Sequence, residues 1–433
     1  MCLTPAAVKR KTRDLIFSLD PGKAAKKATD FSRNRCCPLP DTILFLLSLA
    51  GHSLNTEICD FFLLQGRKPP SASALSQQRD KLRESALPDL FDSFNTLFSF
   101  KKTFHGLHLL AADGSDVNIP ALKGDTSTFV LDKTAQKGHH QMHLDALYDL
   151  LEKRYVDARI SPRAKLNENK ALCEMVDQYA LNGPCLFIAD RGYPTFNTLA
   201  HIQNAGQFFL IRAKTPFSKS SPLKGIGFPE KDEFEIDHHY ILRRRRVKKT
   251  EDRSIYKNLR NDRPFDYIDI KDRTTEYRID FRIIKVRIKE DLYEYLLTNL
   301  PQKAFPVRIL KELYRMRWEI ETSFRRLKYN IGLNFFHSKK RSFIKQEIFA
   351  RLIMHNFVSL IIGCIQVPKK DRKYTYAVSF SDAVAHCKRF LFMKISSVIL
   401  KNLLLKHLTP IRPGRSVPRK VRSQRVQALN NRP

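Results

Sequence analysis

Residues 311–328 have the sequence KELYRMRWEIETSFRRLK, which carries the most informative pattern in the chain. An α-helix turns by about 100° per residue, which places apolar side chains from Leu313 to Leu327 in one compact stripe. A second edge beside that stripe carries Tyr314, Arg317, Glu321 and Lys328 in a line. An ordinary amphipathic helix explains the stripe, but it does not require an acid flanked by Tyr, Arg and Lys. We therefore expect one helix from about Pro306 to Tyr329 with a functional edge.

Two further carboxylates occupy matching places in apolar segments. Residues 108–113 are HLLAAD and residues 185–190 are CLFIAD, so each pattern predicts a buried strand that ends in an aspartate, Asp113 or Asp190. If the strands are neighbours, the two carboxylates converge, and a hard divalent cation relieves their repulsion. An aspartate after a strand is also a common turn former, and Asp116 is a rival for the first position.

The order of predicted strands and helices along the chain indicates an α/β fold with several parts. Residues 1–100 are expected to form a helical, DNA-binding domain, although a helical bundle used only for packing fits as well. Predicted strands alternate with predicted helices in residues 101–215, and the same pattern resumes in residues 285–360. Residues 216–284 are polar and predict a β-rich insertion, with strands at EFEIDHHYIL (233–242), YIDIKD (267–272) and TEYRIDFRIIKVRI (275–288). Residues 361–433 are expected to be helical and to end in a basic tail that touches phosphate.

The charge balance indicates a polyanionic partner. The chain has 77 Lys and Arg against 44 Asp and Glu, a formal net charge of +33 over 433 residues. Such an excess is typical of nucleic-acid binding, because Lys and Arg displace condensed counterions from phosphates. The arginine run at 243–246 and the tail after Ile411 are expected to contribute, whereas a ribosomal or generally basic protein is the plainer alternative.

Other classes of protein are not supported by the sequence. No run of 18 or more apolar residues predicts a membrane span, and the N-terminus lacks the features of a signal peptide. The eight cysteines are scattered without metal-binding spacing and are expected to be reduced thiols. We therefore expect a cytoplasmic, nucleoid-associated protein with no membrane partner.

The motifs together resemble a known family. Tyr314-x2-Arg317-x3-Glu321-x6-Lys328, with Asp113 in DGS and Asp190 in DRGY, is similar to the signature of bacterial insertion-sequence DDE transposases. The resemblance covers about residues 105–357, and the N-terminal hundred residues match only in being helical. It implies an RNase H-like catalytic core that a β-rich insertion interrupts before the third acid.

The resemblance also implies a chemistry and roles for the site residues. Asp113, Asp190 and Glu321 would hold two Mg²⁺ ions, for which Mn²⁺ would substitute, and the enzyme would cleave double-stranded DNA at element ends and join the freed 3′-hydroxyl to target DNA. Further residues are expected to contact DNA: Tyr314, Arg317 and Lys328 at the strand-end phosphate, Arg191 of DRGY, and Trp318. In similar transposases a tryptophan at this position stacks on an extruded base, but packing against the apolar stripe explains Trp318 equally well. Two DNA ends must meet, so a homodimer on DNA is expected.

The sequence leaves two alternatives to a transposase open. An RNase H-like nuclease that cuts without strand transfer would carry similar acids, although the Tyr-Arg-Glu-Lys edge and the basic flanking regions favour a transposase. A DNA-binding derivative that has lost catalysis is the second alternative, and the intact acids speak against it. The long separation of Asp190 from Glu321 favours the interrupted core over the arrangement of retroviral integrases.

Overall fold

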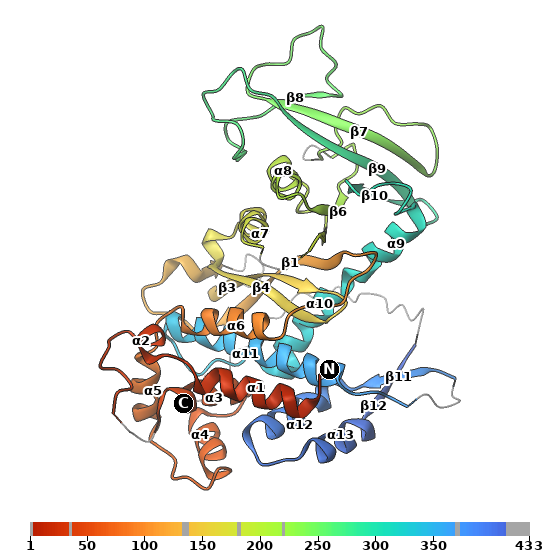
Figure 1. Ribbon diagram of the computed structural model, residues 1–433. Helices are drawn as coiled ribbons and strands as arrows, with labels where there is room; N and C mark the ends of the chain where they lie inside the picture. Colours follow the sequence, from red (N-terminus) through yellow and green to blue (C-terminus); the bar gives the residue numbers. More distant parts are fainter. Residues whose placement is uncertain are drawn as a thin grey trace.

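The structure is a computed structural model, and it describes residues 3–33, 37–131, 138–179, 183–218, 221–368 and 373–412. One large twisted sheet runs through the molecule (Figure 1). Most of the helices cover the face that carries the N-terminal and C-terminal segments, and a pair of helices covers the opposite face. The mixture of one large sheet and helices on both faces agrees with the α/β class expected from the sequence.

The helices and strands alternate as the sequence pattern indicates. The helices are α1 Pro5–Phe17, α2 Pro21–Ala24, α3 Leu39–Ser48, α4 Leu54–Leu63, α5 Ala72–Asp80, α6 Ala86–Leu97, α7 Glu168–Asp177, α8 Phe196–Asn204, α9 Val307–Met316, α10 Trp318–Arg325, α11 Arg341–Gly363, α12 Phe380–Phe392 and α13 Ser397–Lys406. The strands are β1 His108–Ile119, β2 Phe129–Leu131, β3 Gly138–Asp149, β4 Arg154–Pro162, β5 Cys185–Ala189, β6 Phe208–Ala213, β7 Phe234–Arg243, β8 Tyr256–Asn258, β9 Tyr277–Lys289, β10 Leu292–Thr298, β11 Thr375–Val378 and β12 Leu408–Ile411.

The order of strands in the large sheet is β2-β3-β1-β5-β6-β10-β9-β7-β8, and β4 pairs with β3. Strand β1 is antiparallel to β3 and parallel to β5, and β5 is parallel to β6. The pairing of β1 with β5 stops at Ala112 opposite Ala189, although β1 itself continues. The two strands that carry the sequence-predicted aspartates are therefore direct neighbours, and both aspartates follow the point where this parallel pairing ends.

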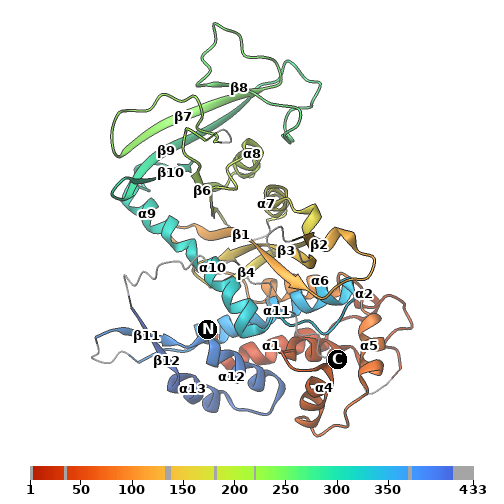
Figure 2. The ribbon, with the colours of Figure 1, turned by 180° about the vertical axis from the view of Figure 1, so that it is seen from behind.

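Two apolar layers enclose the sheet because successive side chains of a strand point to opposite faces. On β1, Leu109 and Ala111 join the core formed with α10, α11 and the N-terminal helices. Leu110 and Ala112 join the second core, beneath α7 and α8. Figure 2 shows α9 and α10 running from β10 past β1 toward α11, which brings the residue 311–328 segment against the sheet.

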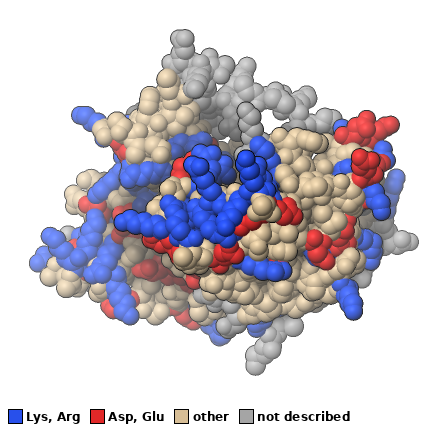
Figure 3. Space-filling view, turned by 90° about the horizontal axis from the view of Figure 1, so that it is seen from above, with Lys and Arg blue, Asp and Glu red and all other residues tan. Residues whose placement is uncertain are grey.

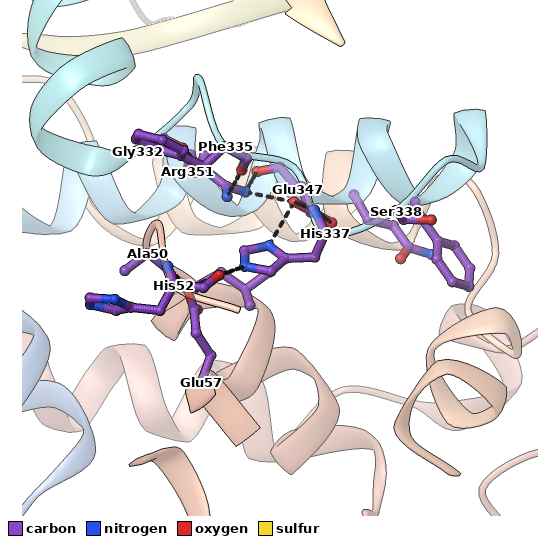
Figure 4. Close-up of polar contacts among 12 residues, drawn as sticks. Ala50, His52, Glu57, Gly332, Phe335, His337, Ser338, Glu347 and Arg351 are labelled. Atoms are coloured by element: carbon purple, nitrogen blue, oxygen red, sulfur yellow. Dashed lines mark hydrogen bonds and ion pairs between the residues drawn. The ribbon is translucent and has the colours of Figure 1, made fainter. Parts of the chain in front are cut away.

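A buried ionic network fastens the N-terminal helices to α11. Glu347 of α11 is fully buried, and its carboxylate lies 2.9 Å from Arg79 of α5, 3.3 Å from Arg351 and 3.4 Å from His337. His337 also lies 3.2 Å from Glu57 of α4 (Figure 4). Burial would raise the pKa of Glu347, but the surrounding cations lower it to about 2. The N-terminal helices are therefore joined to α11, which packs against β4 of the sheet.

The C-terminal part forms a small layer of its own beside α11. Helices α12 and α13 pack together, and β11 pairs with β12 antiparallel. The basic tail expected to touch phosphate falls on residues 413–433, which lie outside the described residues. Within the described ranges, no helix is both long enough and apolar enough to cross a membrane.

Three local expectations are wrong. YIDIKD forms turns rather than a strand, since Asp269 and Asp272 accept hydrogen bonds from backbone N–H groups just after them. The helix expected from Pro306 to Tyr329 is interrupted at Arg317, where the chain turns more tightly, and it finishes as a π-helical turn, Arg326–Ile331. Asp113 does not end its strand: β1 continues to Ile119, because β3 pairs with it along that whole length.

Candidate active site

Three carboxylates from different elements surround one guanidinium group. Asp113 lies on β1 at the first residue beyond the pairing with β5, Asp190 directly follows β5, and Glu321 lies in the first turn of α10. Arg317 lies between them, with Nη2 2.8 Å from Glu321 Oε1 and Nη1 3.8 Å from Asp113 Oδ2. The three acids that the sequence singled out are thus gathered around the side chain of Arg317.

Arg317 is almost completely buried, with 3% of its surface exposed. Burial would lower its pKa, but Glu321, Tyr314 and Asp190 raise it. The Tyr314 hydroxyl donates a hydrogen bond to Asp190 Oδ1 at 3.1 Å. Tyr314, Arg317 and Glu321 therefore still lie on one side of the helical segment, although the helix is interrupted at residue 317. That side faces both aspartates.

The two aspartates have opposite pKa shifts. Burial raises the pKa of Asp113 to about 6, and Glu321 adds to the shift, while Arg317 and the N–H of Gly114 oppose it. Burial would also raise the pKa of Asp190, but the backbone of Arg191, together with Arg317, lowers it below its ordinary value. The difference follows from the partners, because Arg317 and Gly114 offset only part of the effect of burial on Asp113.

Lys328 and Asp116 lie in contact with each other, farther along β1 than Asp113. Lys328, in the π-helical turn, donates from Nζ to the main-chain oxygen of Asp116 at 2.7 Å, and burial lowers its pKa. The carboxylate of Asp116 is on the opposite face of β1 from Asp113, because the two are three residues apart in a strand, and it binds His143. Asp113, rather than its rival Asp116, is the aspartate that faces Glu321.

A match to a known protein family covers this whole arrangement. The family model of the transposase DDE domain matches residues 105–357, which is more than half of the chain and includes all three acids. The chain belongs to the transposase DDE domain family.

Curated relatives match a short part of the chain. The chain is 36% identical over 67 residues to the putative transposase InsL for insertion sequence element IS186A of Escherichia coli strain K12, covering 16% of this chain and 18% of the relative. The transposase for insertion sequence element IS421 of Escherichia coli matches with the same identity and coverage. The chain thus spans about a fifth of the length of these curated relatives.

The solved structures include a distant likeness. A piggyBac transposase synaptic complex with hairpin DNA, determined by cryo-electron microscopy, superposes with a TM-score of 0.49 at 10% sequence identity. The superposition covers 94% of this chain and 87% of that one.

Two of the residues expected to contact DNA are at the surface of the DDE domain. Trp318 is 51% exposed, and its ring lies 5.3 Å from the Arg317 guanidinium. Arg191, which follows Asp190, is exposed as well. About half of the Trp318 surface is therefore open to a partner, and the other half is covered by the protein.

The prediction that the arginine run at 243–246 contributes to DNA binding is wrong for Arg243 and Arg244, which are buried, and stays a prediction for the partly exposed Arg245 and the exposed Arg246. Arg243 is fully buried and pairs with Glu251 and Glu276, and Arg245 pairs with the same two acids. Arg244 is also buried and donates to main-chain oxygens. These guanidinium groups are used to hold the loops around β8, because a strand pairing brought acids from elsewhere in the sequence beside them.

Other cations cover the outer surface of this β7–β9 region. Viewed from above, Lys and Arg gather in a broad patch with fewer acids at its margin (Figure 3). Exposed cations along residues 246–289 are Arg246, Lys248, Lys249, Arg253, Arg260, Arg263, Lys271, Arg273, Arg278, Arg287 and Lys289. The region expected to be a β-rich insertion therefore presents positive charge, but through these residues rather than the buried arginines.

Sequence reasoning missed two groups near the acids. Arg212 of β6 lies 3.7 Å from Asp190 and 2.7 Å from Glu294 of β10. A charged residue inside the apolar segment GQFFLIRAK is the signal that could have found it. His143 and Asp145 of β3 also lie nearby, on the face of the sheet that carries Asp116, and nothing in their local pattern marks them.

Proposed function

We propose that this chain is a DNA transposase that cleaves DNA at the ends of its own insertion element and joins the freed 3′-hydroxyl to target DNA. The observation that carries the proposal is the convergence of Asp113, Asp190 and Glu321 around Arg317 within a transposase DDE domain. The net charge of +33 supports a nucleic-acid partner, and the exposed cations of residues 246–289 supply part of the surface.

The three acids fit a pair of divalent cations such as Mg²⁺. They present only oxygen ligands, which hard cations prefer, and one guanidinium is shared among three carboxylates. The raised pKa of Asp113 comes mainly from burial, with a smaller contribution from Glu321, and a bound cation would offset both effects. When bound, two such ions would lower the pKa of the attacking hydroxyl and stabilise the leaving oxygen, and Mn²⁺ would substitute.

The protein's own residues position the acids and the strand end. Tyr314 holds Asp190 by its hydroxyl, and Arg317 fixes Glu321 and faces Asp113. A phosphate that reaches these carboxylates meets the Arg317 guanidinium, whose planar fork suits phosphate oxygens. We propose that Lys328 adds a point charge to the same phosphate.

The exposed residues are assigned to the DNA outside the reacting phosphate. We propose that Trp318 stacks on a base extruded near the cleaved end, since half of its surface is free and it borders Arg317. Arg191 would contact the DNA backbone beside Asp190. Joining two ends requires two active sites, so the active form would be a homodimer on DNA, within the bacterial cytoplasm.

The strand order supports an assignment of roles to the segments of the chain. The strand order β4-β3-β1-β5-β6, with β1, β3 and β4 antiparallel and β5 and β6 parallel to β1, supports an RNase H-like core. We propose that this core comprises residues 101–215 and 285–360 and that residues 216–284 are its β-rich insertion. Residues 1–100 would bind DNA, and residues 361–433 would form the C-terminal region with the basic tail.

The test is an assay on DNA that carries the element's own terminal sequence. Incubated with Mg²⁺, the full chain is expected to nick the DNA at the element boundary, leave a 3′-hydroxyl, and join that end to a target plasmid. Nicked DNA without joined product would identify a nuclease instead. Binding without either product would identify a DNA-binding derivative that has lost catalysis.

A further inference from the structure

A second group of potential ligands lies on the face of β1 that carries Gly114 and Asp116. His143 and Asp145 project from β3, and Glu168 is the first residue of α7. His143 Nε2 lies 3.3 Å from Asp145 Oδ1 and 3.3 Å from Glu168 Oε1, and one atom from each of the three side chains lies within 4.8 Å of the others. The group offers one imidazole nitrogen and two carboxylate oxygens as potential ligands.

Two buried atoms of the group have no well-formed hydrogen bond with any described residue outside it. His143 Nε2 and Asp145 Oδ1 lie 3.3 Å from each other, and both side chains are only 4% exposed. Because a buried polar atom without a well-formed hydrogen bond is costly, a ligand bound by both atoms would stabilise this arrangement. Burial also raises the pKa of Asp145 above its ordinary value, even though His143 opposes that shift.

The other nitrogen of His143 is held as it is in many metal sites. Its Nδ1 lies 2.7 Å from Asp116 Oδ1. A metal-binding histidine commonly donates its second N–H to a carboxylate, which fixes the tautomer and leaves the opposite nitrogen as the ligand. With Asp116 fixing Nδ1–H, the lone pair on Nε2 would be directed at Asp145 and Glu168.

We propose that His143, Asp145 and Glu168 bind one Zn²⁺ ion, at a site separate from the carboxylates of Asp113, Asp190 and Glu321. Zinc is tetrahedral with ligands at about 2.0–2.1 Å, so two of its ligand atoms lie about 3.3 Å apart. The His143–Asp145 and His143–Glu168 separations equal that value. The imidazole favours Zn²⁺ over Mg²⁺, which prefers oxygen ligands. Glu168 is about one-third exposed, so a water molecule can complete the coordination.

The ion would support the residues that follow the first two acids. A Cβ at Gly114 would overlap His143 Nε2 and lie 2.9 Å from Glu168 Oε1, so only glycine next to Asp113 leaves this space open. Gly192, in the segment after Asp190, also borders Glu168. A bound Zn²⁺ would therefore tie β3 and the start of α7 together beneath both segments and position them.

A protonated histidine is the competing occupant of this space. Burial would lower the pKa of His143, but Asp116, Asp145 and Glu168 raise it to about 11, which favours a ring with a proton on each nitrogen. An imidazolium would then form ion pairs with the carboxylates and leave no nitrogen for zinc. A zinc site predicts one bound Zn²⁺ per chain, whereas a protonated His143 predicts none, and the two results can be distinguished by measuring zinc binding.

The experiment uses the full chain with Asp190→Asn and Glu321→Gln, so that the acids of the candidate active site do not obscure the result. After dialysis against a chelator, Zn²⁺ binding is measured by competition with a chromophoric chelator, and Co²⁺ is bound in parallel for its absorption spectrum. We expect one Zn²⁺ per chain, a tetrahedral Co²⁺ spectrum, and a higher melting temperature with Zn²⁺. These readouts do not depend on DNA cleavage, so they can fail or succeed independently of the proposed function.

Single variants in the same background identify the ligands. Glu168→Gln removes a ligand that is partly exposed, so the fold should persist while stoichiometric zinc binding is lost, as it should be for His143→Gln. Asp116→Asn should weaken binding by about 10- to 100-fold. His201→Gln is the matched control, because both nitrogens of that histidine already contact carboxylates at 2.8 Å, those of Asp177 and Asp266, and it should bind zinc normally. The proposal is overturned if the parent binds no zinc, or if Glu168→Gln retains a full equivalent.

Discussion

Glu321→Gln is expected to reduce cleavage of the element-end DNA by more than about a hundredfold, because a direct metal ligand should matter more than the outer partners whose loss costs 10- to 100-fold. Glutamine keeps the shape of the side chain and an oxygen that can still accept the hydrogen bond from Arg317 at 2.8 Å. The variant therefore removes charge from the site with little disturbance of the helix. Single-turnover cleavage in Mg²⁺ measures the effect, and a band-shift assay should show DNA binding close to that of the unmodified chain.

Glu319→Gln is the control for this prediction. Glu319 lies on the same helix, two residues earlier, but it faces Lys153 and Arg326, each at 3.8 Å. Loose ion pairs of this kind contribute little, so cleavage by Glu319→Gln should stay within about twofold of normal. Equal losses in both variants would mean that the charge pattern of α10, and not a site at Glu321, explains the defect.

Glu347→Gln is expected to reduce the free energy of unfolding substantially. The substitution leaves Arg79 and Arg351 buried without the carboxylate that lies between them. Breaking a buried ion pair from one side costs about 3–5 kcal/mol, because the remaining charge stays desolvated. The network joins α5 and the His337 segment to α11, so unfolding should begin where the N-terminal helices meet that helix. The midpoint of urea unfolding, followed by circular dichroism, measures the loss.

An exposed ion pair on the same helix provides the comparison. Lys345 of α11 pairs with Glu84, and more than half of the Glu84 side chain is exposed to water. Glu84→Gln should therefore change the free energy of unfolding by less than about 1 kcal/mol. If Glu347→Gln were as stable as Glu84→Gln, the buried network would not hold the N-terminal helices in place.

The sequence predicted the elements whose pattern is local. HLLAAD and CLFIAD lie in neighbouring parallel strands, and the residue 311–328 segment brings Tyr314, Arg317 and Glu321 to the two aspartates. Helix capping is equally local: at the start of α5, Ser71 accepts a hydrogen bond from the N–H of Ala74. Periodicity and capping are properties of adjacent residues, and they can be recognised without the fold.

The features that were missed depend on partners far away in the chain. Arg243 is buried because Glu251 and Glu276 reach it, and a run of four arginines gives no sign of this. Asp113 lies within a strand because β3 continues to pair with β1 beyond it. The group at His143 forms only when β3 and α7 meet. In each case tertiary packing, rather than the local pattern, decides the environment of the side chain.

Replacement of Asp190 by cysteine would show whether this side chain binds the catalytic metal ions. Asp190→Cys substitutes a thiolate, a softer ligand that Mn²⁺ accepts more readily than Mg²⁺ does. If Asp190 binds the catalytic ions, cleavage of element-end DNA by Asp190→Cys should be lost in Mg²⁺ and should return in part in Mn²⁺, whereas Asp190→Asn should stay inactive in both. Cleavage by Asp190→Cys at the same rate in Mg²⁺ and in Mn²⁺ would contradict a metal centre at Asp113, Asp190 and Glu321.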